Sequence, residues 1–236
     1  MQTTQLSQIR YITGTLVLQS GLHIGAGESE MRIGGTDKYV VKDPISGLPY
    51  IPGSSLKGKI RSLLEWRHGL VGASKGKPFS FKDLSRLDTP EARHVLKLFG
   101  GAPNADTADL AEEIGPTRLA FWDCHLTPEW IDQLSARNIQ ATEAKSENSI
   151  DRIRGVAENP RLIERVIAGS QFHFKLTLKV IDGEDALPMV LQGLKLLEVD
   201  SLGGSGSRGY GKVVFKNLQI DGISVQADFD QLAAFA

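Results

Sequence analysis

The alternation of apolar and polar residues is clearest in QFHFKLTLKVI, residues 171–181. Apolar side chains occupy every second position from Phe172 to Val180, and polar or charged side chains lie between them. A period of two predicts a strand with one buried face. Three further segments are candidate strands: YITGTLVLQ near the start of the chain, TRLAFWDCHL at 117–126 and KVVFKNLQI at 212–220.

Two other segments show the apolar spacing of an amphipathic helix. The first is expected from roughly Leu56 to Arg67 and the second over roughly 185–199. The expected buried positions are Leu56, Ile60, Leu63 and Leu64 in the first helix, and Leu187, Leu191, Leu194 and Leu197 or Val190 in the second.

The elements follow one another as strand, helix, strand, strand, helix, strand, which is the ferredoxin-like order. We therefore expect an α+β fold and a single domain over residues 1–236. The sheet and its two helices should take up about 8–69, 115–127 and 171–221. Insertions are expected at 22–52, 70–114 and 128–170.

The three insertions differ in character. Residues 22–52 are glycine-rich, and residues 70–114 are polar with uncertain helices. Residues 128–170 form an arm in which ENPR, at 158–161, predicts the tip of a hairpin, because Asn-Pro favours a turn.

Composition narrows the functional class. Of the 236 residues, 41% are hydrophobic, which is enough for a sizeable core, and the formal net charge of −1 gives no general signal for nucleic acid. No apolar run approaches a membrane span, and the first residues lack the apolar core of a signal peptide. The single cysteine, Cys124, excludes an internal disulfide and fits a reducing cytoplasm. The histidines form no metal-ligand spacing with it.

The first helix contains an unexpected glycine, Gly58, which should cost about 1 kcal/mol relative to alanine. On a helical projection Ser54, Lys57, Gly58 and Arg61 share one flank, while Lys59 points elsewhere. This flank suits a polyanion: Ser54 or Ser55 could cap the helix, whose N–H groups attract phosphate. The alternative is a solvated face whose glycine packs against a neighbouring loop. Residues 51–77 are locally basic, with six lysines and arginines against one glutamate.

The segment LGGSGSRGYGKV, at 202–213, matches two phosphate-binding patterns, G-x-G-x-x-G and G-x-x-x-x-G-K. Both patterns require a loop that follows a strand and opens a helix, whereas here a helix precedes the loop and a strand follows it. Val213 also stands where Ser or Thr would hold magnesium. A nucleotide-binding loop is therefore disfavoured. The loop could instead form an anion nest beside Arg208, or simply need glycines for positive φ angles.

Taken together, four segments resemble the RAMP proteins of CRISPR systems, and in particular the repeated backbone subunit of type III effector complexes of the Csm type. The segments are GLHIGAG at 21–27, IGGTDKYVVKDPISGLPYIPGSSLKGKIRSLLE at 33–65, SENSIDRIRGVAENPRLIERV at 146–166 and LGGSGSRGYGKV at 202–213.

The resemblance implies a palm built as a modified RNA-recognition motif, and copies that stack along a guide RNA with other effector subunits. A thumb-like β-hairpin of each copy would displace a base of the guide–target duplex. The subunit would cleave target RNA at regular intervals with Mg²⁺ or Mn²⁺, leaving a 2′,3′-cyclic phosphate and a 5′-hydroxyl. The matching aspartate is Asp37, either as metal ligand or as general base. Without the resemblance, a turn-forming aspartate is the simpler interpretation of Asp37.

Combining residue chemistry with the resemblance, we expect a defined set of RNA-binding residues. These are His23, Ser54, Ser55, Lys57, Gly58, Lys59, Arg61, Arg152, Arg154, Gly203, Gly204, Ser205 and Arg208. His23 could equally be structural, and the apolar residues Ile150, Ile153 and Val156 of the arm could form a wedge between bases or pack against the next subunit. The aromatic motifs of ordinary RNA-recognition motifs are not evident, which favours backbone contacts over base stacking on the sheet.

Two other functions are compatible with the sequence. One is a structural RNA-binding subunit without chemistry, in which Asp37 is incidental. The other is a nucleotide-binding enzyme that uses the glycine loop.

Overall fold

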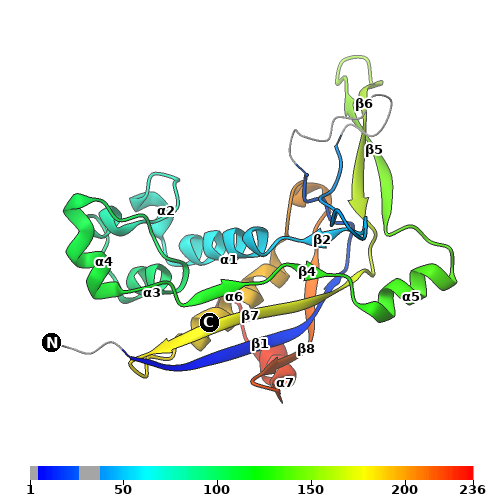
Figure 1. Cartoon of the computed structure of the whole chain (residues 1–236). Coiled ribbons are helices and arrows are strands. Elements are labelled where there is room, and N and C mark those ends of the chain that lie inside the picture. The colour runs from blue at the N-terminus through cyan, green and yellow to red at the C-terminus, as the bar shows by residue number, and fades with distance from the viewer. Residues whose placement is uncertain (1–4, 27–37, 236) are drawn as a thin grey trace.

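The computed structural model describes residues 5–26 and 38–235, and its centre is a five-stranded antiparallel sheet. The strands lie in the order β3-β7-β1-β8-β9 (Figure 1). Their bounds are β1 Leu6–Leu18, β3 Leu119–Phe121, β7 Gln171–Ile181, β8 Val213–Ile220 and β9 Ile223–Ser224. With the first and fourth strands of the motif adjacent, this is the ferredoxin-like arrangement, as the element order predicted.

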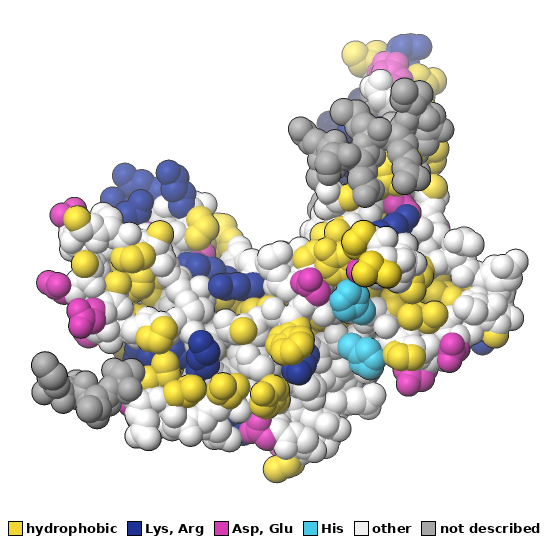
Figure 2. Space-filling view, viewed as in Figure 1, with side chains coloured by type: hydrophobic (Ala, Val, Ile, Leu, Met, Phe, Trp, Pro, Cys, Tyr) yellow, Lys and Arg dark blue, Asp and Glu magenta, His cyan; other side chains and the backbone are white. Residues whose placement is uncertain are grey.

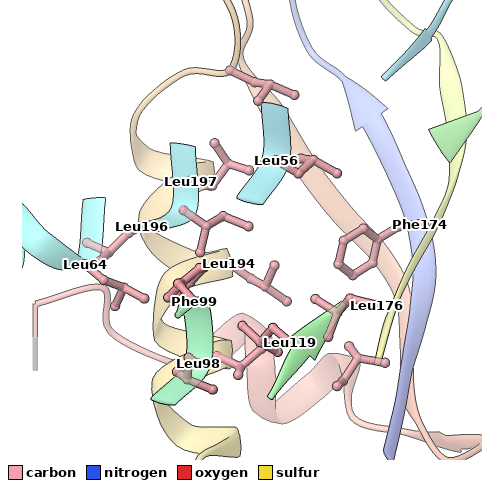
Figure 3. Packing of buried hydrophobic residues seen from close by; sticks show 14 of the residues in the cluster. Leu56, Leu64, Leu98, Phe99, Leu119, Phe174, Leu176, Leu194, Leu196 and Leu197 are labelled. Carbon is pink, nitrogen blue, oxygen red and sulfur yellow. The ribbon is translucent and has the colours of Figure 1, made fainter. Parts of the chain in front are cut away.

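Helices α1 (Gly53–Arg67) and α6 (Leu187–Val199) cover one face of this sheet. Leu56, Ile60 and Leu64 of α1 are fully buried, as their spacing predicted. They pack with leucines of α6 and with Phe174 and Leu176 of β7 (Figure 3). Burying this many large apolar side chains supplies the main driving force for the fold.

Residues 70–114 form a helical lobe at one end of the sheet (Figure 1). It contains α2 (Leu70–Ala73), η2 (Phe81–Ser85), α3 (Pro90–Phe99), η3 (Ala105–Thr107) and α4 (Ala108–Ile114). The side chain of Thr89 caps α3 by accepting the Ala92 N–H at 3.2 Å. The segment whose helices were uncertain from sequence is therefore helical, and α3 contributes Leu98 and Phe99 to the core.

The opposite end carries the thumb, the hairpin of β5 (Thr142–Ile150) and β6 (Ala157–Val166), which stands away from the sheet (Figure 1). It is reached through α5 (Pro128–Ala136). Two short strands, β2 (Tyr50–Ile51) and β4 (Cys124–His125), pair beside α1. The remaining elements are η4 (Gly206–Arg208) and α7 (Gln226–Gln231).

The predicted tip of the thumb was wrong. Residues 158–161 lie inside β6, and the turn is made by residues 151–156, where the Asp151 carboxylate accepts the N–H groups of Ile153 and Arg154. Asn159 has a φ of 51° beside a register shift between Glu147 and Ser149. Asn-Pro therefore produces a β-bulge rather than a turn, because proline tolerates a bulge where it cannot complete a ladder.

Among the described residues, no helix is long and apolar enough to cross a bilayer.

Candidate RNA interface

A groove of about 480 Å³ runs along the exposed flank of α1, between this helix and the start of the helical lobe. Its lining includes Ser54, Lys57, Gly58 and Arg61, which the helical projection had placed together, and also Lys77 from the lobe. Figure 2 shows the surface hollowed between the lobe and the thumb, with dark blue basic side chains over α1 and on the lobe. The name α1 groove is used below for the groove lined by Ser54, Lys57, Gly58, Arg61 and Lys77.

Gly58 opens directly into the groove. A Cβ atom built at this position would meet nothing within 4 Å, and the residue is exposed. Packing against a neighbouring loop, the alternative left open by the sequence, is therefore excluded for the described residues. The glycine leaves space beside Lys57, which forms no ion pair within residues 5–26 and 38–235.

Arg61 is engaged inside the protein, which the sequence did not predict. Its Nε lies 2.7 Å from the Glu65 carboxylate, and its guanidinium also donates to the Phe79 carbonyl oxygen. Glu65 in turn accepts the Phe79 N–H at 3.0 Å. Arg61 thus fastens the chain that leads out of α2 and forms the wall of the groove. The Arg61 charge is neutralised by the buried Glu65 carboxylate. The positive charge that the groove can offer to a ligand therefore comes from Lys57 and Lys77.

Lys59 points away from the groove, as projected, and pairs with Asp200 at 2.6 Å. As an RNA contact it is therefore poorly placed, because its ammonium is already neutralised on the opposite side of the helix.

The expected serine cap is wrong. The helix begins at Gly53, so Ser54 and Ser55 lie within its first turn, and neither side chain caps it. The Gly53 N–H instead donates to the Asp123 carboxylate at 2.7 Å. A Cβ on Gly53 would lie 2.8 Å from the Phe121 carbonyl oxygen, so glycine allows the helix to start against β3. No local sequence signal links Asp123 to a helix that lies 70 positions away.

The glycine loop follows α6 and precedes β8, which confirms the order that disfavoured a nucleotide-binding loop. Gly203 has a φ of 73°, and a Cβ there would lie 2.4 Å from the His23 carbonyl oxygen, which also accepts the Gly204 N–H at 2.9 Å. The N–H groups of Gly204, Arg208 and Gly209 are thus used internally, and Ser205 adopts a left-handed conformation. These glycines serve close packing and positive φ more than an anion nest.

Arg208 connects the glycine loop to the thumb. Its Nε lies 3.0 Å from a carboxylate oxygen of Glu147 on β5, and its guanidinium lies 2.5 Å from the Ser205 hydroxyl. Beneath this pair Tyr210 is fully buried. Burial, together with the neighbouring Glu147 carboxylate, raises the pKa of Tyr210 to about 12. Lys145 lies over the Tyr210 ring at 4.5 Å.

A polar pocket of about 310 Å³ opens above this junction. It is lined by Lys145, Glu147, Asn148, Ser149, Asn159, Arg161 and Arg208. Arg208 is more than half exposed there, so it can still reach a ligand from its place beside Glu147.

Glu164 of β6 ties the base of the thumb to the glycine-rich insertion. Its carboxylate accepts from the Val40 N–H at 3.0 Å, the Lys42 ammonium at 2.6 Å and the Thr142 hydroxyl at 2.8 Å. Burial opposes ionisation, but these three donors outweigh it and lower the pKa of Glu164. The Glu164 carbonyl oxygen lies 2.7 Å from His23 Nδ1. His23 is therefore buried and structural in the isolated chain.

Asp37, the expected catalytic residue and metal ligand, lies outside the described residues. The described chain on its carboxyl side contacts the thumb, since Lys38 bridges to Ile163 and the Val40 N–H donates to the Glu164 carboxylate at 3.0 Å. Lys38, the described residue next to Asp37, therefore lies beside the thumb base.

The thumb tip holds the two expected arginines. Arg154 pairs with Glu158 at 3.0 Å, whereas Arg152 is exposed and forms no ion pair with a described residue. Ile153 between them is 98% exposed. Apolar and cationic groups thus project together from the end of the hairpin.

Comparison with known proteins places this geometry in a family. The RAMP superfamily model matches residues 15–214. A "CRISPR system Cms endoribonuclease Csm3" from Mycobacterium tuberculosis is 43% identical over 234 residues, which cover 92% of this chain and 90% of the relative. A protein of the same name from Methanothermobacter thermautotrophicus is 39% identical, with 94% of each chain covered.

A solved structure has a similar fold. The crystal structure of a Csm3–Csm4 subcomplex in the type III-A CRISPR-Cas interference complex superimposes with a TM-score of 0.54 and 28% identity, covering 92% of this chain and 80% of that chain. One conclusion follows from these comparisons. The family model spans most of the sequence, the relatives are about 40% identical, and the solved structure shares the fold. The chain belongs to the RAMP superfamily.

Proposed function

We propose that the protein is the repeated backbone subunit of a type III CRISPR effector complex and that it is an endoribonuclease. In this role it binds a guide RNA, stacks with further copies of itself and other effector subunits, and cleaves complementary target RNA in the cytoplasm. The observation that carries the proposal is the α1 groove, in which Lys57 and Lys77 flank an open glycine. Relatives of nearly full coverage named as CRISPR endoribonucleases support it.

The groove suits an RNA backbone for a physical reason. Gly58 adds no side chain to the floor, so a sugar-phosphate chain can approach the helix closely. Lys57 and Lys77, which form no ion pair with a described residue, can then replace counterions on the phosphates, which is a contact independent of base sequence. Guide sequences vary, and a backbone subunit must accept all of them.

Cleavage uses the nucleophile that RNA itself carries. The 2′-oxygen forms a bond to the adjacent phosphorus while the bond from phosphorus to the 5′-oxygen breaks, leaving a 2′,3′-cyclic phosphate and a 5′-hydroxyl. The 2′-hydroxyl loses its proton and the departing 5′-oxygen gains one. The protein must bend the strand so that attack is in line, a task that fits a thumb with exposed apolar residues at its tip.

We assign to Asp37 either proton transfer or metal binding in this step. Its carboxylate would accept the 2′-hydroxyl proton or help to hold Mg²⁺ or Mn²⁺. Such an ion would neutralise charge on the scissile phosphate. Among the described residues there is no group of three or more metal-ligating side chains. A lone carboxylate still fits magnesium, which commonly binds one or two protein carboxylates together with phosphate oxygens.

The test uses assembled complexes and a labelled RNA complementary to the guide. Asp37→Ala and the isosteric Asp37→Asn should leave assembly and target binding close to wild type and abolish cleavage, since each 1.36 kcal/mol lost from transition-state stabilisation slows the step about tenfold. Asp43→Asn is the matched control, because Asp43 lies in a turn of the same insertion, where it accepts the Ser46 N–H at 2.7 Å, and it should retain cleavage.

EDTA should stop the wild-type reaction, and magnesium or manganese should restore it. Regularly spaced fragments produced at full rate by both Asp37 variants would remove Asp37 from the chemistry. Absence of cleavage in wild-type complexes would favour the scaffold function without catalysis.

A further inference from the structure

The face of the sheet opposite α1 and α6 is not covered by any described helix (Figure 1). Its exposed aromatic side chains come from separate segments, and no local sequence pattern groups them. Tyr11 on β1 is 46% exposed and Trp122, just after β3, is 51% exposed. Both lie on this open face, because their neighbours Ile12 and Phe121 point into the core.

A lysine lies between the two rings. The Lys175 ammonium of β7 is 3.8 Å from the Trp122 ring centroid and 5.3 Å from that of Tyr11. The register explains this: the Trp122 N–H donates to the Lys175 carbonyl oxygen, and Tyr11 pairs with Thr177, two residues further along β7. The three side chains thus come from adjacent strands and form one platform.

The remainder of the open face is cationic. Lys179 is opposite Ile9, and Lys216 is opposite Thr15 in the β1 ladders, so both lysines point outward. Neither forms an ion pair with a residue of 5–26 or 38–235. The outward positions of β1, β3, β7 and β8 carry no carboxylate. In a chain of net charge −1, this is a marked local excess of positive charge.

At the edge of the platform a second flat group is present. Tyr50 of β2 and His125 of β4 stack with ring centroids 5.5 Å apart and planes 20° from parallel. Figure 2 shows yellow, dark blue and cyan side chains gathered over this edge and over β1 and β7.

We propose that this open face, centred on Tyr11, Trp122 and Lys175, is a second RNA-binding surface that takes an unpaired RNA segment by base stacking. Exposed aromatic rings offer flat faces to bases, and nearby lysines contact the phosphates between them. The surface goes beyond the proposed guide-binding function, because Tyr11, Trp122 and Lys175 do not line the α1 groove.

A protein partner fits this face less well. A docked apolar surface would remove three lysines from water without giving them acceptors, which is unfavourable. A strand of phosphates and bases satisfies both the charges and the rings.

The test measures binding of a short fluorescent oligouridine to the full chain by anisotropy. Trp122→Leu and Tyr11→Leu keep apolar bulk but remove the ring, and each should weaken binding roughly tenfold, in line with the loss of one base–aromatic stack. Trp122→Phe and Tyr11→Phe are the matched controls and should bind within about twofold of wild type, because they retain a ring that can stack. Thermal unfolding of each variant checks that the fold is intact.

Mapping separates this surface from the α1 groove. Irradiation of a 4-thiouridine RNA should crosslink peptides that contain Tyr11 or Trp122, and these crosslinks should persist in a Lys57→Ala, Lys77→Ala variant. Crosslinks confined to α1, or equal binding by the leucine and phenylalanine variants, would overturn the proposal. So would concentration-dependent self-association that the leucine variants abolish while RNA binding is unchanged, since the face would then be an interface between copies.

Discussion

Two glycines within helices have opposite reasons to be glycine. Gly193 of α6 faces α1, where a Cβ would lie 2.6 Å from Ile60 Cγ2 and 3.1 Å from Leu64 Cδ1. Its lack of a side chain lets the two helices approach each other. Gly58 of α1 faces open space, and no contact among the described residues requires it. The free energy of folding alone would therefore favour alanine at Gly58, and binding is the remaining reason for glycine.

We expect Gly58→Ala to raise the free energy of unfolding of the isolated chain by up to about 1 kcal/mol, the helix-propensity difference between the two residues. The same substitution should weaken RNA binding in the α1 groove, because the added methyl group stands where the backbone approaches. Urea unfolding and filter binding measure the two effects separately.

Gly193→Ala is the matched control for this prediction. It has the same propensity gain but should destabilise the protein, since overpacking a helix interface typically costs about 1–3 kcal/mol. Gly58→Ala with unchanged stability and unchanged RNA binding would show that the open position has no role.

At the scale of elements, the thumb depends on Glu164. One carboxylate on β6 holds the backbone of Val40, the ammonium of Lys42 and the hydroxyl of Thr142, so the glycine-rich insertion and both thumb strands meet at a single group. Such a buried network is stabilising only while the carboxylate is ionised and all its donors are satisfied.

The stability of this junction should therefore depend on pH. Because the pKa of Glu164 is lower in the folded chain than its usual value of 4.5, its contribution is complete above about pH 4.5 and is lost as the pH falls through the folded pKa. Glu164→Gln should lower the free energy of unfolding at pH 7 by about 1–3 kcal/mol. The difference between variant and wild type should shrink on acidification, as measured by urea unfolding at pH 7 and at lower pH.

Glu143→Gln provides the comparison for this experiment. Glu143 is on the same hairpin but forms an exposed pair with Arg165 at 2.8 Å, and such surface pairs contribute about 0–1 kcal/mol. A Glu164→Gln variant as stable as Glu143→Gln at pH 7 would contradict the anchoring role.

At the scale of the whole molecule, the fold brings basic side chains together on one part of the surface, although the composition is nearly neutral. The net charge is −1, yet the hollow between the helical lobe and the thumb exposes basic side chains (Figure 2). Of the six cations in residues 51–77, Lys59 and Arg61 are neutralised by Asp200 and Glu65. Lys57 and Lys77 remain available to phosphates in the α1 groove.

Lys57→Ala combined with Lys77→Ala should weaken binding of single-stranded RNA with little dependence on its sequence. The slope of log K against log salt concentration should flatten by roughly 1.4 units, because two phosphate contacts are lost. Filter binding across a salt series measures this slope.

Lys59→Ala tests whether the change in the salt slope depends on where the lysine lies or only on the loss of one positive charge. It removes a cation from the same helix, but one that is paired with Asp200 on the other side, so the slope should change little. An equal flattening by Lys59→Ala and by Lys57→Ala would mean that general electrostatic attraction, and not the groove, binds RNA.

The ferredoxin-like order was predictable from the sequence, since a strand of period two and a helix of period 3.6 each follow from the residues of one segment. It placed β7 at 171–181, which is also where the structure has it, and it put Lys57 and Gly58 on one flank of α1. The rejection of a nucleotide-binding loop likewise needed only the order of helix and strand.

Which charged groups stay unpaired and which aromatic groups come together depends on contacts between distant parts of the chain. Arg61 donates to the Phe79 carbonyl oxygen and the cap of α1 comes from Asp123, because these contacts form between segments that meet only after folding. The Arg61–Glu65 pair, four residues apart on one helix, is local. Tyr11, Lys175 and Trp122 are far apart along the chain and become neighbours through strand pairing alone. Local periodicity encodes which face of an element is buried, whereas the partner of an exposed side chain depends on register and packing between distant elements.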